Sequence, residues 1–229
     1  MNVGVSIFLL LSASACTSSG DSSRATLSST TSFPLPDPRL EGDLSVEAAL
    51  AARRSVRSYA RQPLSLADLG QLLWAAQGIS GANRRYRTAP SAGALYPLEL
   101  YAVVGDVEEL DAGVYHYDPA AHALTQVKRS DVRAALSRAA LGQAWVEEGA
   151  VVLVFAAVYE RTTGKYGTRG RQYVHMEAGH ASQNVYLQAT ALELGTVAVG
   201  AFDDNEVQRV VGLSDDERPL YLMPVGRRR

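Results

Sequence analysis

The residues best suited to bind a charged ligand lie together in the segment AARRSVRSY, residues 51–59. Arg53, Arg54, Ser55 and Arg57 stand at the end of an alanine-rich helical stretch. Guanidinium groups bind phosphate oxygens through paired hydrogen bonds, and a hydroxyl can bind the polar edge of a ring. The segment therefore favours an anionic ligand. The alternative is a solvated helix end, where arginines complement the helix dipole.

A second segment, RTAPSAGALYPLEL at residues 87–100, places rigid and small residues just before a strand-like run. Pro90 and Gly93 predict a tight turn, in which Ser91 hydrogen-bonds the neighbouring backbone. Small residues also allow the backbone to approach a flat ligand closely. Both interpretations can hold together, because a ligand-binding wall also needs a rigid turn.

Other residue types exclude several kinds of chemistry. The motifs GxGxxG, GxxxxGK[ST], HExxH and GxSxG are absent, and Cys16 is the only cysteine, which excludes an intramolecular disulfide and a cysteine-based metal site. His175 and His180 are the only histidines that could share a region, and five residues on a helix separate them by about 140° around its axis. We therefore predict no metal site and assign the histidines to polar contacts.

Composition predicts one folded domain. The chain has 229 residues, of which 47% are hydrophobic, and this suffices for one substantial core. The formal net charge is -2, with acidic and basic residues interspersed. A nucleic-acid partner is not expected, since its binding surface would require a strong basic excess.

The elements that must position these residues mix helices and strands without a regular alternation. Ser45 predicts a helix cap for a helix to about Ala52, and Ser65 with Asp68 predicts a second helix that ends at Gly78. Strands are predicted at residues 98–104, 113–117, 122–127 and 150–159, with a short helix near 130–140. The fold class is therefore α+β.

The C-terminal part contains the longest periodic segment, residues 173–195. Apolar residues recur there at intervals of three and four, which predicts a buried helix ended by Gly195. A strand at 196–199, a short helix from Asp203 or Asp204 to Gly212, and a strand at 220–225 complete the chain.

The first forty residues are predicted to lie outside this domain. Residues 1–15 are typical of a cleaved signal peptide, because the apolar stretch is far shorter than the roughly 20 residues of a spanning helix. Cys16 follows in the place of a lipidated cysteine, and residues 16–40 read as a Ser/Thr/Pro-rich tether before a domain at 41–229. We expect export and membrane attachment through Cys16. The alternative is a disordered extension on a cytoplasmic protein.

Four motifs in this order resemble the FMN-dependent nitroreductase superfamily. They are Arg-Arg-Ser-Val-Arg-Ser-Tyr, Ala-Pro-Ser-Ala-Gly-Ala-Leu-Tyr-Pro, Lys-Tyr-Gly-Thr-Arg-Gly and Glu-Ala-Gly-His-Ala-Ser-Gln-Asn. More narrowly, they are similar to the branch of SagB-type dehydrogenases, which oxidise azoline rings to azoles. The resemblance covers about residues 45–229. It implies a nitroreductase-like fold with a mixed, mainly antiparallel sheet flanked by helices, and a homodimer with active sites at the subunit interface.

The resemblance also implies a set of cofactor ligands. The phosphate, ribityl chain and pyrimidine edge of FMN would contact the first motif, the ring would lie against the proline–serine turn, and backbone amides after the strand at 196–199 would meet flavin N5. Arg227 is a further candidate phosphate ligand. The implied residues are Arg53, Arg54, Ser55, Arg57, Pro90, Ser91, Ala92, Gly93, Gly200, Ala201 and Arg227.

Lys165 and Tyr166 match a lysine–tyrosine pair that the azoline-oxidising enzymes use near their substrate. A lysine can act as a base when burial or nearby cations lower its pKa, and Arg161 and Arg169 could supply such cations. The alternative is that Lys165, in the predicted polar loop 160–170, only contacts solvent.

The function implied by the resemblance is hydride transfer through flavin N5. The reductant would be NAD(P)H or an oxidisable substrate such as an azoline, and the oxidant would be oxygen, a quinone or a nitroaromatic compound. Two alternatives from other classes are a surface lipoprotein that binds flavin or a related ligand without turnover, and a purely structural lipoprotein.

Overall fold

The computed structural model describes residue 1, residues 31–81 and residues 86–229. One sheet organises these residues, with the strand order β1-β7-β6-β5-β8-β10-β2 and β9 paired to β10. The strand pairings in it are antiparallel. The strands are β1 (Ser32–Pro34), β2 (Tyr59–Ala60), β5 (Leu98–Val104), β6 (Gly113–Asp118), β7 (Ala123–Lys128), β8 (Val151–Val158), β9 (Leu194–Thr196) and β10 (Glu217–Arg228); β3 (Ile79–Ser80) and β4 (Tyr86–Arg87) form a separate hairpin.

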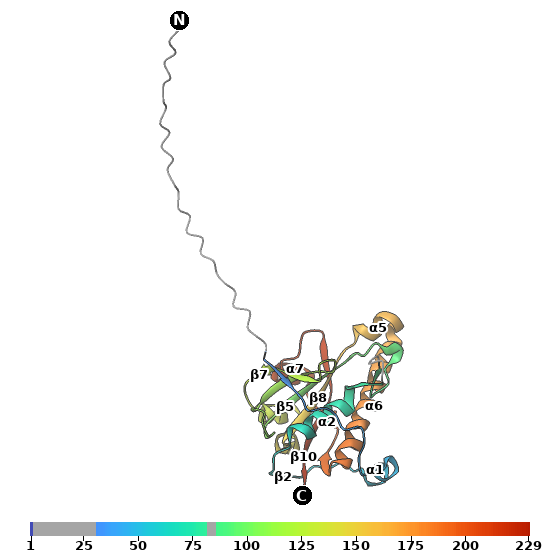
Figure 1. The fold of residues 1–229 in the computed structure, drawn as a ribbon, viewed down its shortest axis with the longest axis vertical. Helices are drawn as coiled ribbons and strands as arrows, with labels where there is room; N and C mark the ends of the chain where they lie inside the picture. Colours follow the sequence, from blue (N-terminus) through green and yellow to red (C-terminus); the bar gives the residue numbers. More distant parts are fainter. Residues whose placement is uncertain (2–30, 82–85) are drawn as a thin grey trace.

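The sheet lies between two helical layers, so the prediction of an α+β fold with a mainly antiparallel sheet is confirmed. The first layer contains α2 (Leu66–Gln77) and α6 (Gly170–Ala191), and the second contains α3 (Arg133–Ala139), α4 (Ala144–Glu148) and α7 (Asp204–Val211). In Figure 1, α6 runs along one side of the sheet, with α5 (Glu160–Tyr166) at one end and α1 (Val46–Ala52) at the other.

The sheet has one hydrophobic core on each face, and the central strands contribute side chains to both, because successive side chains of a strand point to opposite faces. Leu153 and Phe155 of β8 pack in the core under α2 and α6, whereas Val152 and Val154 pack under α3, α4 and α7. A strand buried on both faces is hydrophobic throughout, which explains the unbroken apolar sequence of β8.

The predicted helix caps are confirmed. Ser45 accepts a hydrogen bond from the Ala48 amide at 3.1 Å, and Ser65 accepts one from the Asp68 amide at 3.1 Å. Asp203 caps α7 in the same way, and Gly212 ends it in a left-handed conformation with a φ of 84°. These helix ends depend on local hydrogen bonds, so a few neighbouring residues suffice to predict them.

Two predictions about the region around α6 are wrong. The helix ends at Ala191, and Gly195 lies in β9, where a Cβ would come within 2.7 Å of Val56. Gly195 is thus required by close packing against the arginine-rich segment and not by the helix end. The predicted polar loop at 160–170 is instead helix α5 followed by a 3-10 turn at Gly167–Arg169.

The boundary predicted at residue 41 is also too late. β1 pairs with β7, Phe33 packs edge to face on Tyr115 at 5.6 Å, and Leu35 is buried. Gln71 binds both the amide and the carbonyl of Arg39, at 2.8 and 3.0 Å. The apolar Phe33 and Leu35 therefore attach residues 32–39 to the domain despite the surrounding prolines and serines.

The predicted signal peptide and Cys16 fall in residues 2–30, outside the described residues. Within the described ranges, we find no helix of sufficient length and apolar character to span a membrane.

Candidate functional site

The hydroxyl of Tyr186 on α6 joins two of the predicted cofactor-binding segments. Ser55 Oγ lies 3.0 Å from Tyr186 Oη, and the Ala198 amide donates to the same oxygen at 2.7 Å. The Val56 amide also donates to the Thr196 carbonyl at 2.8 Å. The segments at 53–57 and 196–201, which are far apart in sequence, are thereby held side by side.

The arginines of the first segment have different environments. Arg54 donates to the carbonyls of Ala51 and Arg53 and so closes the C-terminal end of α1. Arg53 lies over the ring of Tyr186 at 5.1 Å, and Arg57 lies over that of Trp145 at 5.6 Å. Among the described residues, no carboxylate pairs with any of the three arginines. The charges of Arg53 and Arg57 are therefore free to bind an anion.

Two buried polar atoms beside this segment lack partners. Within the described part of the chain, neither Nε1 of Trp145 nor Oγ1 of Thr196 has a hydrogen-bond partner. An unpaired buried donor costs about 1–3 kcal/mol, so such a group is expected to meet a ligand or an ordered water. The indole N–H of Trp145, next to Arg57, suits a ring carbonyl such as those at the pyrimidine edge of a flavin.

Gly200 and Ala201 form a turn two and three residues after Ala198, whose amide contacts Tyr186. The Ala201 carbonyl accepts a hydrogen bond from Gln143 Nε2 at 2.9 Å, which fixes this turn to the segment preceding α4. Gly200 lines a cavity of about 660 Å³ together with residues of α6 and β10. The turn therefore lies between Arg57 and an open space that is large enough for a small substrate.

The predicted turn at Pro90–Gly93 is present in the form expected from its residues. Gly93 has a φ of 64°, and Ser91 Oγ accepts a hydrogen bond from the Tyr96 amide at 2.9 Å. A Cβ on Gly93 would come within 2.8 Å of Tyr166 Oη and 3.0 Å of Lys165 Nζ. Lys165 and Tyr166 thus pack directly on this turn, and Lys165 is exposed in the single chain.

Charged groups hold α5 and the turn together. Glu99 pairs with His116 at 2.8 Å and with Arg161 at 2.5 Å, and Arg161 donates to the Tyr96 carbonyl. Hydrogen bonds from His116 and Arg161 outweigh burial and lower the pKa of Glu99. Arg161 is therefore paired with Glu99 in the single chain and links α5 to the residue that follows the turn.

Beneath the turn lies Glu177 of α6, which is almost fully buried. Burial raises its pKa to about 7, although the Ser91 hydroxyl and the Arg87 charge favour the ionised form. Its Oε1 has no hydrogen-bond partner among the described residues. The structure thus places Glu177 in contact with the predicted cofactor-facing turn.

The two groups of predicted ligands do not meet in one chain. Ser91 faces Glu177, whereas Ser55 contacts Tyr186, nine residues further along α6. At 1.5 Å per residue, these points are about 13 Å apart along the helix axis. Figure 1 shows α5 and α1 at opposite ends of α6.

The C-terminal arginines are held within the fold. Arg227 pairs with Asp68 of α2 at 2.8 Å, Arg228 donates to the Leu194 carbonyl, and Arg229 donates to the Tyr59 carbonyl. A phosphate contact by Arg227 stays a prediction, and it would compete with the ion pair to Asp68.

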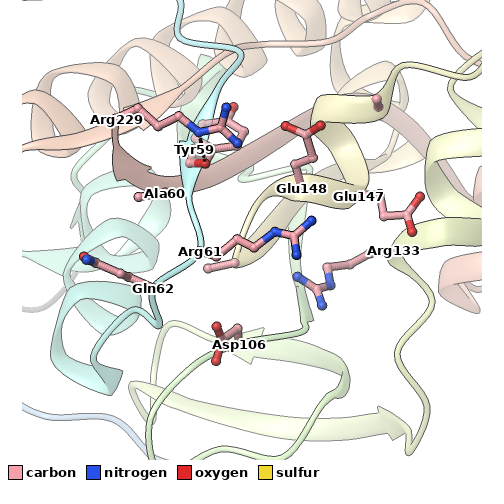
Figure 2. Close-up of a pocket in the computed structure, with 11 residues that line it drawn as sticks. Tyr59, Ala60, Arg61, Gln62, Asp106, Arg133, Glu147, Glu148 and Arg229 are labelled. Carbon is pink, nitrogen blue, oxygen red and sulfur yellow. Dashed lines mark hydrogen bonds between the residues drawn. The ribbon is translucent and has the colours of Figure 1, made fainter.

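Figure 2 shows a separate cavity of about 480 Å³ next to β2, in which Arg229 reaches Tyr59. Three basic and three acidic residues line it: Arg61, Arg133 and Arg229 with Asp106, Glu147 and Glu148. Its charges are balanced, and none of the predicted cofactor-binding residues lines it. We therefore do not assign the cofactor to it.

Comparison with known proteins identifies the family of this chain. The sequence profile of the nitroreductase family matches residues 50–227. MJ1384, a nitroreductase homologue of Methanocaldococcus jannaschii, is 48% identical over 199 residues, which is 87% of this chain and 98% of that protein. A nitroreductase-fold structure from Ralstonia eutropha superposes with a TM-score of 0.76 at 30% identity, covering 86% of this chain and 90% of that one.

The chain therefore belongs to the nitroreductase family, whose members are oxidoreductases and generally bind FMN. It is also similar to McbC, the microcin B17-processing protein of Escherichia coli, with 30% identity over 166 residues. These cover 70% of this chain and 60% of McbC. The resemblance inferred from the four motifs is confirmed.

Sequence reasoning missed Gln143, Trp145 and Tyr186. In the sequence, Tyr186 is one more apolar position of a buried helix, and Trp145 lies in a helix of only five residues. Neither position carries a local signal for ligand binding. Only the packing of α4 and α6 against the arginine segment gives these side chains their place.

Proposed function

We propose that the chain is an FMN-dependent oxidoreductase that transfers hydride between NAD(P)H and a quinone or nitroaromatic acceptor. The observation that supports this proposal most directly is a junction at Tyr186, whose hydroxyl contacts both Ser55 and the Ala198 amide. This junction brings free guanidinium groups and the backbone of the Gly200 turn to one place. FMN, when bound, supplies the two-electron chemistry at its N5 atom.

In this proposal each part of the site has one task. Arg53 binds the phosphate, because no carboxylate of the described residues neutralises it. Ser55 binds the ribityl chain, while Arg57 and the unpaired Trp145 N–H bind the pyrimidine edge. The amides of Gly200 and Ala201 hold the N5 edge, and Gln143 fixes their orientation through the Ala201 carbonyl.

The proposal includes a homodimer in which the turn at Pro90–Gly93 covers the flavin of the partner subunit. The separation of about 13 Å along α6 supports this, since a single chain leaves the turn away from the arginine segment. The surface next to α1 also exposes apolar residues: Leu40 is 81% exposed, Val46 64% and Leu50 53%. Apolar surface of this kind is typical of protein–protein interfaces.

Oxidation of an azoline is a second candidate activity, favoured by the position of Lys165 and Tyr166. Both pack on Gly93, so in the proposed dimer they would lie over the partner's flavin. There the Lys165 amine could remove a carbon-bound proton while hydride leaves the substrate, once the partner subunit buries it. The similarity to McbC supports this candidate.

An anaerobic half-reaction experiment tests the primary proposal. Full-length protein loaded with FMN is mixed with NADPH or NADH, and the visible flavin absorbance is followed. We expect bleaching by a reduced nicotinamide and recovery on addition of a quinone. A protein that binds FMN but is bleached by neither nicotinamide would contradict the reductase activity and leave the azoline substrate as the electron donor to examine.

A further inference from the structure

A tyrosine and a histidine meet at the wall of the cavity beside Gly200. Tyr159 directly follows β8, and its hydroxyl lies 2.5 Å from Nε2 of His175 on α6. The two rings are edge to face, with centroids 5.7 Å apart. Tyr159, His175 and Gly200 all line the same cavity of about 660 Å³. The pair therefore borders the space into which the proposed reactive edge of the flavin opens.

Burial keeps Tyr159 a phenol. Burial raises its pKa, and Asp204 of α7 acts in the same direction, while Arg171 of α6 opposes them. The Arg171 guanidinium lies over the Tyr159 ring at 4.5 Å, one helical turn from His175. Arg218 of β10 also lines the cavity, and Glu160 of α5 borders a smaller one with Tyr159. Tyr159 is thus suited to donate a proton.

His175 is placed to resupply that proton. Its Nε2 faces Tyr159, and within the described ranges its Nδ1 has no hydrogen-bond partner, while the side chain is exposed. Imidazole is the side chain that ordinarily gains and loses a proton near neutral pH. A proton can therefore pass from solvent to His175 and from there to Tyr159.

We propose that Tyr159 and His175 form a proton relay for the oxygen of a quinone bound in this cavity, an inference that rests on the proposed function. The quinone takes up hydride from the reduced flavin at one oxygen and needs one proton at the other to become the hydroquinone. The Tyr159 O–H bond breaks as the substrate O–H bond forms. The Nε2–H proton of His175 then restores the phenol, and water reprotonates His175.

A second tyrosine–histidine pair in the chain provides a matched control. Tyr117 Oη lies 2.9 Å from His122 Nδ1, with ring centroids 5.8 Å apart. The other ring nitrogen of His122, Nε2, hydrogen-bonds the Pro36 carbonyl at 2.9 Å. This pair therefore holds the N-terminal residues against the sheet. Neither residue lines the cavity beside Gly200.

The test compares two oxidants of the reduced, FMN-loaded full-length protein in stopped flow. 1,4-Benzoquinone needs a proton to form the hydroquinone, whereas ferricyanide accepts electrons alone. We expect Tyr159→Phe and His175→Gln to slow reoxidation by benzoquinone roughly 10- to 100-fold and leave that by ferricyanide unchanged. Tyr117→Phe and His122→Gln leave both rates unchanged. The solvent deuterium isotope effect on the benzoquinone step disappears in Tyr159→Phe.

A second readout does not depend on FMN. In the protein without cofactor, the NMR chemical shifts of the His175 ring protons change in Tyr159→Phe and stay the same in Tyr117→Phe. An unchanged benzoquinone rate, equal slowing with both oxidants, or unchanged His175 chemical shifts would overturn the relay. If Tyr159→Phe fails to fold, His175→Gln, which alters an exposed side chain, carries the kinetic test. Wild-type protein that binds no FMN overturns the proposed function instead, and the chemical shifts alone then decide whether the pair is coupled.

Discussion

The two ends of α6 differ in how their polar groups are satisfied. Near Tyr186, Arg53 and Arg57 lie on aromatic rings without carboxylate partners, and the Trp145 N–H is unpaired among the described residues. Near the N-terminal end, Glu99 pairs with both His116 and Arg161. The first end presents guanidinium groups without carboxylate partners, as a site for an anionic ligand would, whereas the second holds a turn through the ion pairs of Glu99.

Loss of the Arg53 guanidinium, at the end of α6 near Tyr186, should have the largest effect on FMN binding. In Arg53→Gln we expect the Kd for FMN to rise about 30- to 150-fold, because a charge-assisted contact with phosphate contributes roughly 2–3 kcal/mol. Arg61→Gln, in the cavity of Figure 2, serves as the control and should leave the Kd unchanged. Equal weakening in both variants would show that only overall charge matters. Titration with FMN measures both.

Distortion of the turn at the second end should reduce turnover. Gly93→Val introduces a Cβ within 2.8 Å of Tyr166 Oη, so Tyr166 and Lys165 must move away, and a φ of 64° strains any residue other than glycine. We expect kcat to fall about 10- to 100-fold. Gly164→Val, where a Cβ meets no atom within 4 Å, is the control.

The same variant tests whether the two ends meet across a dimer. Mixed dimers of Gly93→Val and Arg53→Gln chains contain one site with both parts intact. Co-expression should therefore restore activity above that of either variant alone. Activity that never recovers in the mixture would place both parts of a site in one chain.

Removal of the Tyr186 hydroxyl should have an intermediate effect. Tyr186→Phe removes the contacts with Ser55 and the Ala198 amide, so we expect the Kd for FMN to rise about tenfold, or roughly 1–2 kcal/mol. Tyr173→Phe, at the other end of the same helix, should change the Kd less. A larger effect from Tyr173→Phe would reverse the roles given to the two ends.

Protonation of Glu177 should change the stability of the fold rather than the affinity for FMN. Its folded-state pKa of about 7 lies above the ordinary value of 4.5, so the folded state binds the proton more tightly. The resulting stabilisation is fully present below about pH 4.5 and is lost as the pH rises through 7. Urea unfolding should show wild type losing up to roughly 3 kcal/mol from this group between pH 4.5 and 8. Glu177→Gln should lack this loss, and an identical pH dependence in both proteins would contradict the assignment.

The parts of the fold that the sequence predicts are those that depend on neighbouring residues. Ser45, Ser65 and Gly212 act through hydrogen bonds or backbone angles within a few positions, and their roles are confirmed. Gly195 was misread because its partner, Val56, is more than a hundred residues away. Helix α5 was missed because its glycine and polar residues give no amphipathic pattern, and packing on α6 stabilises it.

The same limit applies to the candidate site: residues in short motifs could be predicted from the sequence, and residues contributed by distant helices could not. Arg53, Ser55, Arg57 and Gly93 belong to short motifs whose residue types already indicate their chemistry. Trp145 and Tyr186 are contributed by helices whose apolar sequence is equally consistent with core packing. Their role depends on distances across the fold, which no single segment encodes.

Binding of FMN to the full-length chain tests the central claim most directly. Titration followed by flavin absorbance and tryptophan fluorescence should give one FMN per chain. The fluorescence quenching should be lost in Trp145→Phe and kept in Trp74→Phe, and binding should be strongly weakened in Arg53→Gln. A chain that stays colourless in excess FMN, or that binds it equally well without Arg53, would contradict the account.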